Sequence, residues 1–188
     1  MLWKHFKGLR LEAEILTLRG SILSHIFPNG VKQSAFMSSI VRLASAATRN
    51  VALTATTTID ATYSADRNLI MNAAVAATFT LPNATGSGNR FRFVVGAVNT
   101  SSYIIKSSRG ADLMKGIVFN SNSASAGATR GWNPAATDDT FTLNGTTTGG
   151  SAVGDWAIFE DAGVNLWIVH GMTTANAAPA TPFSDTVA

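Results

Sequence analysis

Hydrophobic and polar residues alternate in short segments along the chain from about residue 51 to residue 172. In the clearest segment, Arg90–Val95, two phenylalanines and a valine fall on one face of an extended strand and two arginines on the other. Similar patterns predict further strands at Ala77–Leu81, Ser102–Lys106, Met114–Phe119, Thr140–Leu143, Trp156–Glu160 and Leu166–His170. Many short strands and little helical periodicity predict an all-β domain.

Clusters of turn-forming residues separate these segments. Pro82 and the stretch Asn83–Asn89 follow the first strand and predict a hairpin that joins Ala77–Leu81 to Arg90–Val95. The five residues Asp161–Asn165 predict a second hairpin between the two tryptophan-containing strands. We therefore expect a single antiparallel β-sandwich or jelly-roll-like domain over residues 51–172.

The two ends of the chain follow other patterns. Residues 1–36 carry apolar residues at helical spacing, and we expect either a helical arm or an upstream extension preceding a true start at Met37. Residues 37–50 are interpreted as a linker or docking arm. Residues 173–188 predict an extended tail, in which Phe183 is the one large apolar side chain and a candidate anchor to a neighbouring subunit.

Charged residues make up only 13% of the chain, while Ala, Thr, Ser, Gly and Asn are abundant. A surface built from small neutral residues keeps free monomers apart poorly, because charge is what maintains colloidal solubility. Such a surface suits a subunit that its neighbours cover, and the alternative is an exposed sheet rich in Thr and Asn. The chain has no cysteine, so its stability must come from the core or from oligomerisation.

The net charge of +3 is unevenly distributed. Residues 1–49 hold seven Lys/Arg and two Glu, a charge of +5, and the remainder holds seven Lys/Arg and nine Asp/Glu, a charge of −2. A basic arm favours docking on an acidic protein surface, and Arg42 and Arg49 are its candidate contacts. The scattered cations predict no nucleic-acid partner, and the lack of a long apolar run predicts no membrane partner. Without a secretory signal, we expect synthesis in a cytoplasm and no export.

Titratable residues are too few and too dispersed for a recognisable catalytic motif. The three histidines form no metal-binding pattern, and His170 is expected to be exposed or at an interface. The carboxylate pairs Asp138-Asp139 and Glu160-Asp161 are adjacent in sequence, so the side chains of each pair point to opposite faces. The three aspartates are expected to bond the backbone two residues on. The sequence predicts no enzyme activity, no cofactor and no metal site, with calcium as the weaker alternative.

Four strings of the sequence resemble segments that recur in a known family of virion proteins. These strings are Thr80–Gly88, Arg90–Val95, Asp139–Gly150 and Gly154–Trp156. They are similar to the capsid decoration, or cement, proteins of tailed bacteriophages, and the similarity extends over residues 40–183. The resemblance implies a homotrimer on the capsid surface of the virion, with the major capsid protein as partner and no catalytic residue.

The alternative is a tail-fibre or host-attachment module that binds surface glycans through exposed aromatic residues. Trp132, next to Gly131, is a candidate inter-subunit or ligand contact, and Trp156 and Trp167 are further candidates for sugar binding. Burial in the sandwich core is the expected fate of the last two. Fibre shafts usually show sequence repeats, and this chain has none at a period of 20–50 residues.

Overall fold

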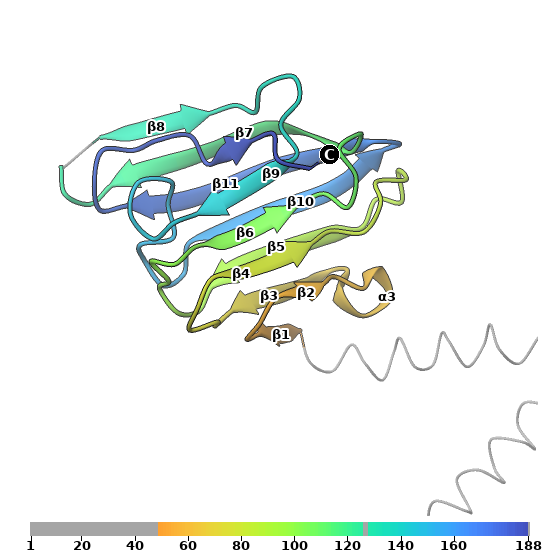
Figure 1. Cartoon of the computed structure of the whole chain (residues 1–188), viewed down its shortest axis with the longest axis horizontal. Helices are drawn as coiled ribbons and strands as arrows, with labels where there is room; N and C mark the ends of the chain where they lie inside the picture. The colour runs from red at the N-terminus through yellow and green to blue at the C-terminus, as the bar shows by residue number, and fades with distance from the viewer. Residues whose placement is uncertain (1–48, 126–127, 188) are drawn as a thin grey trace, which may run out of the picture. The chain divides into compact units, whose positions relative to one another are not determined.

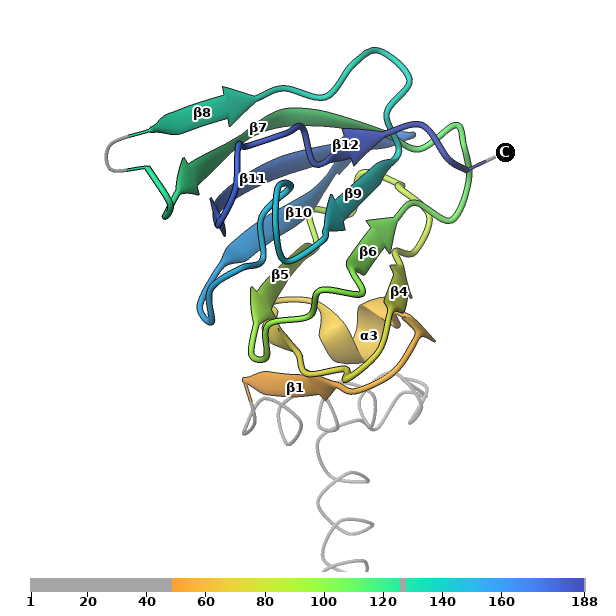
Figure 2. The same ribbon diagram turned by 60° about the vertical axis from the view of Figure 1, so that its left-hand side comes forward.

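The computed structural model describes residues 49–125 and 128–187, all within the compact unit Ser45–Ala188. The predictions for residues 1–36, for Arg42 and for most of the arm 37–50 lie outside the described residues. The described part is a sandwich of two stacked β-sheets (Figures 1 and 2), which confirms the all-β sandwich.

Seven strands form the larger layer, called sheet A, in the order β1-β3-β5-β10-β11-β7-β8. Five strands form the smaller layer, sheet B, in the order β12-β9-β6-β4-β2. The strands of sheet A are β1 (Asn50–Leu53), β3 (Arg67–Met71), β5 (Arg90–Val95), β7 (Leu113–Asn122), β8 (Thr129–Trp132), β10 (Trp156–Gly163) and β11 (Leu166–Ala175). Those of sheet B are β2 (Thr57–Thr58), β4 (Ala77–Thr80), β6 (Tyr103–Lys106), β9 (Thr140–Leu143) and β12 (Phe183–Ser184).

A single helical turn, α3 (Ala61–Ser64), joins β2 to β3, and Asp60 caps it by accepting a hydrogen bond from the Thr62 amide at 2.7 Å.

Both sheets are mixed, so the antiparallel pairing expected of the sandwich holds for only part of each sheet. In sheet A, β1, β3 and β5 are mutually parallel, and β11 is parallel to β7. In sheet B, β2, β4 and β6 are also parallel neighbours. The parallel pairs among the first six strands follow from the chain path: from β1 to β6 each strand lies in the sheet opposite its predecessor, so strands two apart become parallel neighbours.

The predicted hairpin between Ala77–Leu81 and Arg90–Val95 is wrong for the same reason. Both strands exist, but β4 belongs to sheet B and β5 to sheet A, and the intervening loop crosses between layers. Sheets pack about 10 Å apart, a distance that the seven residues 83–89 span easily. The second predicted hairpin is confirmed as β10–β11, with a bulge between Asp161 and Gly163 and a tighter turn than the five-residue loop expected.

Aromatic side chains from both sheets fill the core. Phe159 of β10 meets Phe93 at 5.5 Å between ring centroids and Phe141 of the opposite sheet at 5.7 Å, both edge to face. Trp167 is fully buried, as predicted, and packs on Phe91 at 5.8 Å. Edge-to-face aromatic pairs contribute roughly 0.5–1.5 kcal/mol beyond their burial, so this cluster fixes how the two sheets stack.

The C-terminal segment belongs to the domain, which corrects both the boundary at residue 172 and the free tail over 173–188. β11 continues to Ala175, which is buried, and β12 then pairs with β9 at the edge of sheet B. Phe183 is only 5% exposed and packs on Phe141 at 5.3 Å. It is an anchor, as expected of a lone aromatic residue, but it fills the chain's own core and not a neighbouring subunit.

Candidate functional site

The structure does not gather the predicted contact residues into one site. Arg49 is exposed just before β1 at one edge of sheet A, and its carbonyl accepts a hydrogen bond from the Asn68 amide at 2.8 Å. Trp132 lies on β8 at the opposite edge of the same sheet, half-buried against the core. Phe183 is inside the core. Of these residues, only Arg49 and part of Trp132 are accessible for a partner.

Five carboxylates are buried, and each is used to hold a loop. They are Asp112, Asp138, Asp139, Asp155 and Asp161. Both members of the 138–139 pair were expected to bond backbone two residues on, but Asp138 accepts the Ala135 amide, three residues earlier, at 2.7 Å. Asp139 accepts the distant Thr186 amide at 3.0 Å and so holds the C-terminal tail. All five accept backbone amides, and Asp112 also pairs with Arg109 at 2.7 Å, so these carboxylates are used within the fold.

Asp161 is the most heavily bonded of these carboxylates. Its oxygens accept the amides of Thr85, Gly86 and Ser87 at 2.9, 2.7 and 3.0 Å, and the hydroxyls of Thr85 and Ser87 also donate to it. The expected bond within its own loop is therefore replaced by a bond to the distant β4–β5 loop. Burial alone raises the pKa of Asp161, but the hydrogen bonds from Ser87, Gly86 and Thr85 together outweigh it and lower the pKa.

Asp155 shows the opposite balance. Burial raises the pKa of its carboxyl, and the bonds that it accepts from Thr174 at 2.8 Å and from Gly150 at 3.0 Å lower the pKa by less. The Asp155 carboxylate thus joins the loop before β10 to the C-terminal end of β11. Both shifted carboxyls therefore act inside the fold, as links between loops and sheet A.

Metal and membrane features are not found in the described part of the chain. Residues 49–125 and 128–187 contain no group of three His, Asp or Glu side chains placed to hold a metal ion. No helix in these ranges has the length and apolar character that a bilayer crossing requires.

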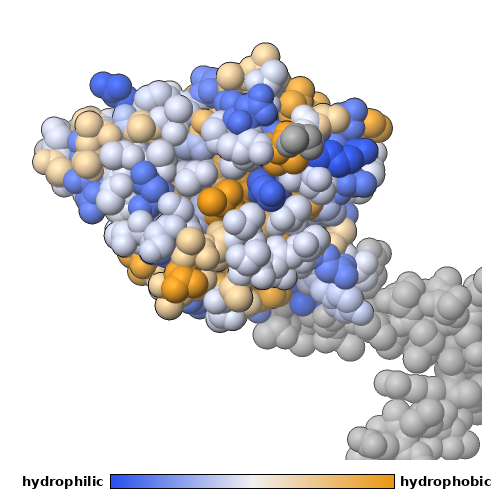
Figure 3. Space-filling view, in the orientation of Figure 1, coloured by the Kyte–Doolittle hydropathy of each residue, from blue (hydrophilic) through white to orange (hydrophobic). Residues whose placement is uncertain are grey.

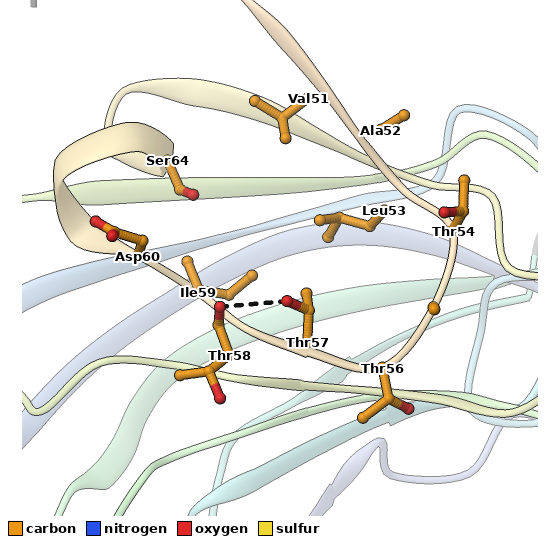
Figure 4. A pocket seen from close by; sticks show the side chains of 11 residues that line it. Val51, Ala52, Leu53, Thr54, Thr56, Thr57, Thr58, Ile59, Asp60 and Ser64 are labelled. Carbon is orange, nitrogen blue, oxygen red and sulfur yellow. Dashed lines mark hydrogen bonds between the residues drawn. The ribbon is translucent and has the colours of Figure 1, made fainter.

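A shallow hollow of about 390 Å³ lies between β1, β2 and α3. Figure 4 shows Leu53 and Ile59 near its middle and Thr54 and Asp60 toward its sides. The Asp60 carboxylate is already bonded to the helical turn, so the hollow offers mainly threonine hydroxyls and apolar groups. Hydroxyls of this kind suit weak polar binding, and the hollow contains no second titratable group.

The outer face of sheet A carries a continuous line of apolar residues, here called the apolar row. The strand registers place one residue of each strand side by side across the whole sheet. In sheet order the row is Ala52, Ile70, Val94, Trp156, Met172, Phe119 and Gly131. Met172 is 59% exposed and Phe119 is 45% exposed, although both stand in the middle strands of the sheet.

Charged residues on the same face form contacts within the chain. Arg90 pairs with Glu160 at 2.8 Å, and Lys115 donates to the carbonyls of Ala135 and Ala136 at 2.8 and 3.0 Å. The guanidinium of Arg92 lies 5.3 Å from the ring centre of Trp156 in the apolar row. Trp156 is thus half-buried on the outer face, which corrects its expected burial in the core.

The outer face of sheet B has a different character. Its outward positions include Thr58, Thr78, Thr80 and Thr142, with Ile104 and Lys106 between them. Figure 3 views the domain from this side, and most of its surface there is pale, neither strongly hydrophilic nor strongly hydrophobic. This threonine face matches the composition-based expectation of a neutral surface.

Comparisons with protein-family models, with curated proteins and with solved structures find no match. The resemblance to decoration proteins therefore rests on the sequence strings alone.

Sequence reasoning missed the apolar row, although a signal for it exists. In Trp156–Glu160 and Leu166–His170 both alternating sets contain apolar residues, so neither face of these two strands is polar throughout. Strands of this kind are expected where both faces of a sheet are covered. Here the inner face meets sheet B, and within the described residues the outer face has no covering layer.

Proposed function

We propose that this protein is a non-enzymatic structural subunit of a virus particle, which binds the outside of an icosahedral phage capsid as an oligomer and stabilises the shell. The observation that carries the proposal is the pair of sheet faces, of which one carries the apolar row and the other is threonine-rich. Exposed apolar patches on a folded domain mark surfaces that other proteins cover.

The buried carboxylates support the same proposal. Because Asp112, Asp138, Asp139, Asp155 and Asp161 brace loops inside the domain, they contribute little negative charge to the surface. A surface with low charge density associates readily, which is a liability for a free enzyme and an advantage for an assembly subunit. Binding that occurs only on the assembled lattice then adds its free energy to the stability of the shell.

Contact with the major capsid protein is assigned to the basic arm. Arg49 is exposed at the edge of sheet A, and Arg42 precedes it in the sequence. An arginine presents a planar, permanently charged group that pairs well with carboxylates of an acidic shell surface. Several copies on one particle would make these individually weak contacts additive through effective concentration.

Quantitative mass spectrometry of purified particles tests this proposal. Many copies should be found per particle, and mild chaotrope should release them from heads rather than tails. The variant Arg49→Gln should bind empty shells more weakly, whereas Arg130→Gln, which removes an exposed cation at the opposite edge of sheet A, should bind normally. Absence of the chain from heads would refute the proposal.

The tail-fibre alternative predicts a few copies that stay with the tails. Half-buried Trp132 and the hollow beside β1 are the features that favour glycan binding. Against it, the guanidinium of Arg92 lies over the ring of Trp156, the aromatic residue best placed on a flat face for stacking on a sugar. Glycan-array binding that is lost in Trp132→Ala would favour the alternative.

A further inference from the structure

The outer face of sheet A, which the apolar row crosses, approaches the size of a protein interface. Neighbouring strands lie about 4.8 Å apart, so a row across the seven strands of sheet A is roughly 29 Å long. Residues on one face of a strand repeat every ~6.8 Å, and three intervals give a face about 20 Å high. This projected area of roughly 600 Å² approaches the ~800 Å² per partner that stable interfaces bury.

The row does not stand alone on this face. Half-buried Ile158 on β10 and Ile117 on β7 flank it, with the exposed His170 of β11 between them. Half-buried Ile168 lies one position further from the row on β11. The two large exposed members, Met172 and Phe119, are direct neighbours across β11 and β7. Flexible methionine beside an aromatic ring gives an adaptable contact surface of the kind enriched at protein interfaces.

The charges on the face indicate which partner fits. Arg90 and Glu160 neutralise each other, Lys115 is held by two carbonyls, and Arg92 lies against Trp156. A face whose charges are satisfied internally lacks a charge pattern that would select an oppositely charged partner. It can, however, meet an identical face without strong like-charge repulsion.

Symmetry also favours the same face of another copy. A ring built from head-to-tail contacts needs a second, different surface to receive the apolar row. The other broad face of the described domain, on sheet B, presents threonine hydroxyls and Lys106, which would leave the row against polar groups. A two-fold contact needs only one apolar face, which is used twice.

We infer that the outer face of sheet A packs against the same face of a second copy of this chain, about a two-fold axis parallel to the apolar row. An axis along the central strand β10 would instead place Glu160 opposite its own copy. The axis parallel to the row puts Met172 over Met172 and Phe119 over Phe119, and it moves the charged positions of the two copies apart. This inference concerns the isolated chain and does not depend on the proposed attachment to a capsid.

Light scattering coupled to gel filtration of the full-length chain is the first test. The wild type should elute as a dimer over a concentration series, because packed sheet faces bury the apolar row. Met172→Glu should shift the population to monomer by at least tenfold in dissociation constant, since it places two carboxylates against each other in an apolar contact. Thr142→Glu is the matched control on the outer face of sheet B and should remain dimeric.

Cross-linking tests the axis itself, and the chain offers a clean background because it has no cysteine. Packed sheets lie about 10 Å apart, so a bis-maleimide of about that length should join Met172→Cys to its own copy in high yield. Thr58→Cys, which is exposed on the outer face of sheet B, should give little product. Circular dichroism of each variant checks that the fold is retained.

A wild-type monomer at all concentrations would overturn the inference. So would a trimer, or an oligomer that Met172→Glu dissolves while Met172→Cys fails to cross-link, since the row would then face a different surface. These outcomes are separable from the proposed function. A dimer that is absent from heads refutes only capsid binding, and a monomer that is abundant on heads refutes only the two-fold contact.

Discussion

The two outer faces of the sandwich differ although the inner faces are alike. Sheets A and B both direct aromatic and aliphatic residues inward, and these form one shared core. Outward, sheet B presents threonines, whereas sheet A presents an apolar row across its full width. Within the described residues the core is already complete between the sheets, so the packing of sheet A on sheet B does not account for the apolar row.

This difference shows which of the two outer faces suits water and which suits contact with another protein surface. Threonine suits an exposed strand, because its β-branched side chain favours extended backbone while its hydroxyl stays hydrated. Exposed Met172 and Phe119 have no such benefit to the isolated domain. We therefore interpret sheet B as the scaffold's solvent-compatible layer and sheet A as its associating layer.

The largest expected effect comes from breaking sheet B at its C-terminal anchor. Phe183→Ala removes a ring that is 5% exposed and packed on Phe141, so it should lower the free energy of unfolding by about 3–4 kcal/mol. Urea denaturation followed by tryptophan fluorescence measures this loss. Ser184→Ala, at the next residue of β12, should cost less than about 1 kcal/mol and serves as the control.

Phe183→Ala also tests whether the two layers unfold together. Since the core is shared, the variant should keep one cooperative transition by both fluorescence and far-ultraviolet circular dichroism. Two separate transitions would contradict a single sandwich core and would leave sheet A as an independent unit.

Strands were predicted better from the sequence than their pairing was. Alternation in Arg90–Val95 and Thr140–Leu143 identified strands and their inward residues correctly, because burial of one face is a local property. Pairing is not local: β4 and β5 are adjacent in sequence but lie in different sheets, and no residue of the 83–89 loop reveals the crossing. The tail was misjudged because its burial depends on a partner strand, β9, some forty residues earlier in the chain.

The sequence predicted that the aspartates bond backbone groups, but it did not predict which backbone groups they bond. A buried aspartate at a strand end was expected to bond backbone, and Asp138 does so three residues away at Ala135. For Asp161 the partners lie in the β4–β5 loop, where Gly86 has a φ of +80°. Glycine favours that backbone conformation, which turns successive amides toward one anion. The glycines were visible in the sequence, but the anion that they surround was not.

A medium effect is expected from Asp161→Asn, which weakens the link between the β4–β5 crossover and sheet A. An amide group replaces one acceptor oxygen with a donor, so the variant should lose about 2–3 kcal/mol of stability at pH 7. The folded-state pKa of Asp161 is lowered, so its contribution is present above the unfolded-state pKa and is lost as the pH falls through the folded-state pKa. The gap between wild type and variant should therefore narrow below about pH 4.

Asp155→Asn is the control, because the pH dependence of its effect on stability should be opposite to that of Asp161→Asn. Its folded-state pKa is raised, so the carboxyl favours the folded state most below its unfolded-state pKa and loses that advantage as the pH rises through the folded-state pKa. The stability gap between wild type and Asp155→Asn should thus narrow from pH 3 toward pH 7. Urea denaturation of wild type and both variants at several pH values measures how each stability difference changes with pH. The same change for both variants would contradict the opposite pKa shifts of Asp161 and Asp155.

The smallest effect distinguishes two arginines on the associating face itself. Arg92→Gln removes a guanidinium that lies 5.3 Å from the ring centre of Trp156 and that donates to Asn68 at 3.2 Å, so it should cost about 0.5–1 kcal/mol. Arg90→Gln breaks only a solvent-screened pair with Glu160, and its cost should stay below about 0.5 kcal/mol at moderate salt. Thermal unfolding in low and in high salt separates the two variants, because screening removes the Arg90 effect and leaves most of the Arg92 effect.

Arg92→Gln should also alter the fluorescence of Trp156, since the guanidinium lies over that ring in the apolar row. If both variants lost equal stability with equal salt dependence, Arg92 would be an ordinary surface charge, and its contact with Trp156 would add nothing to the apolar row.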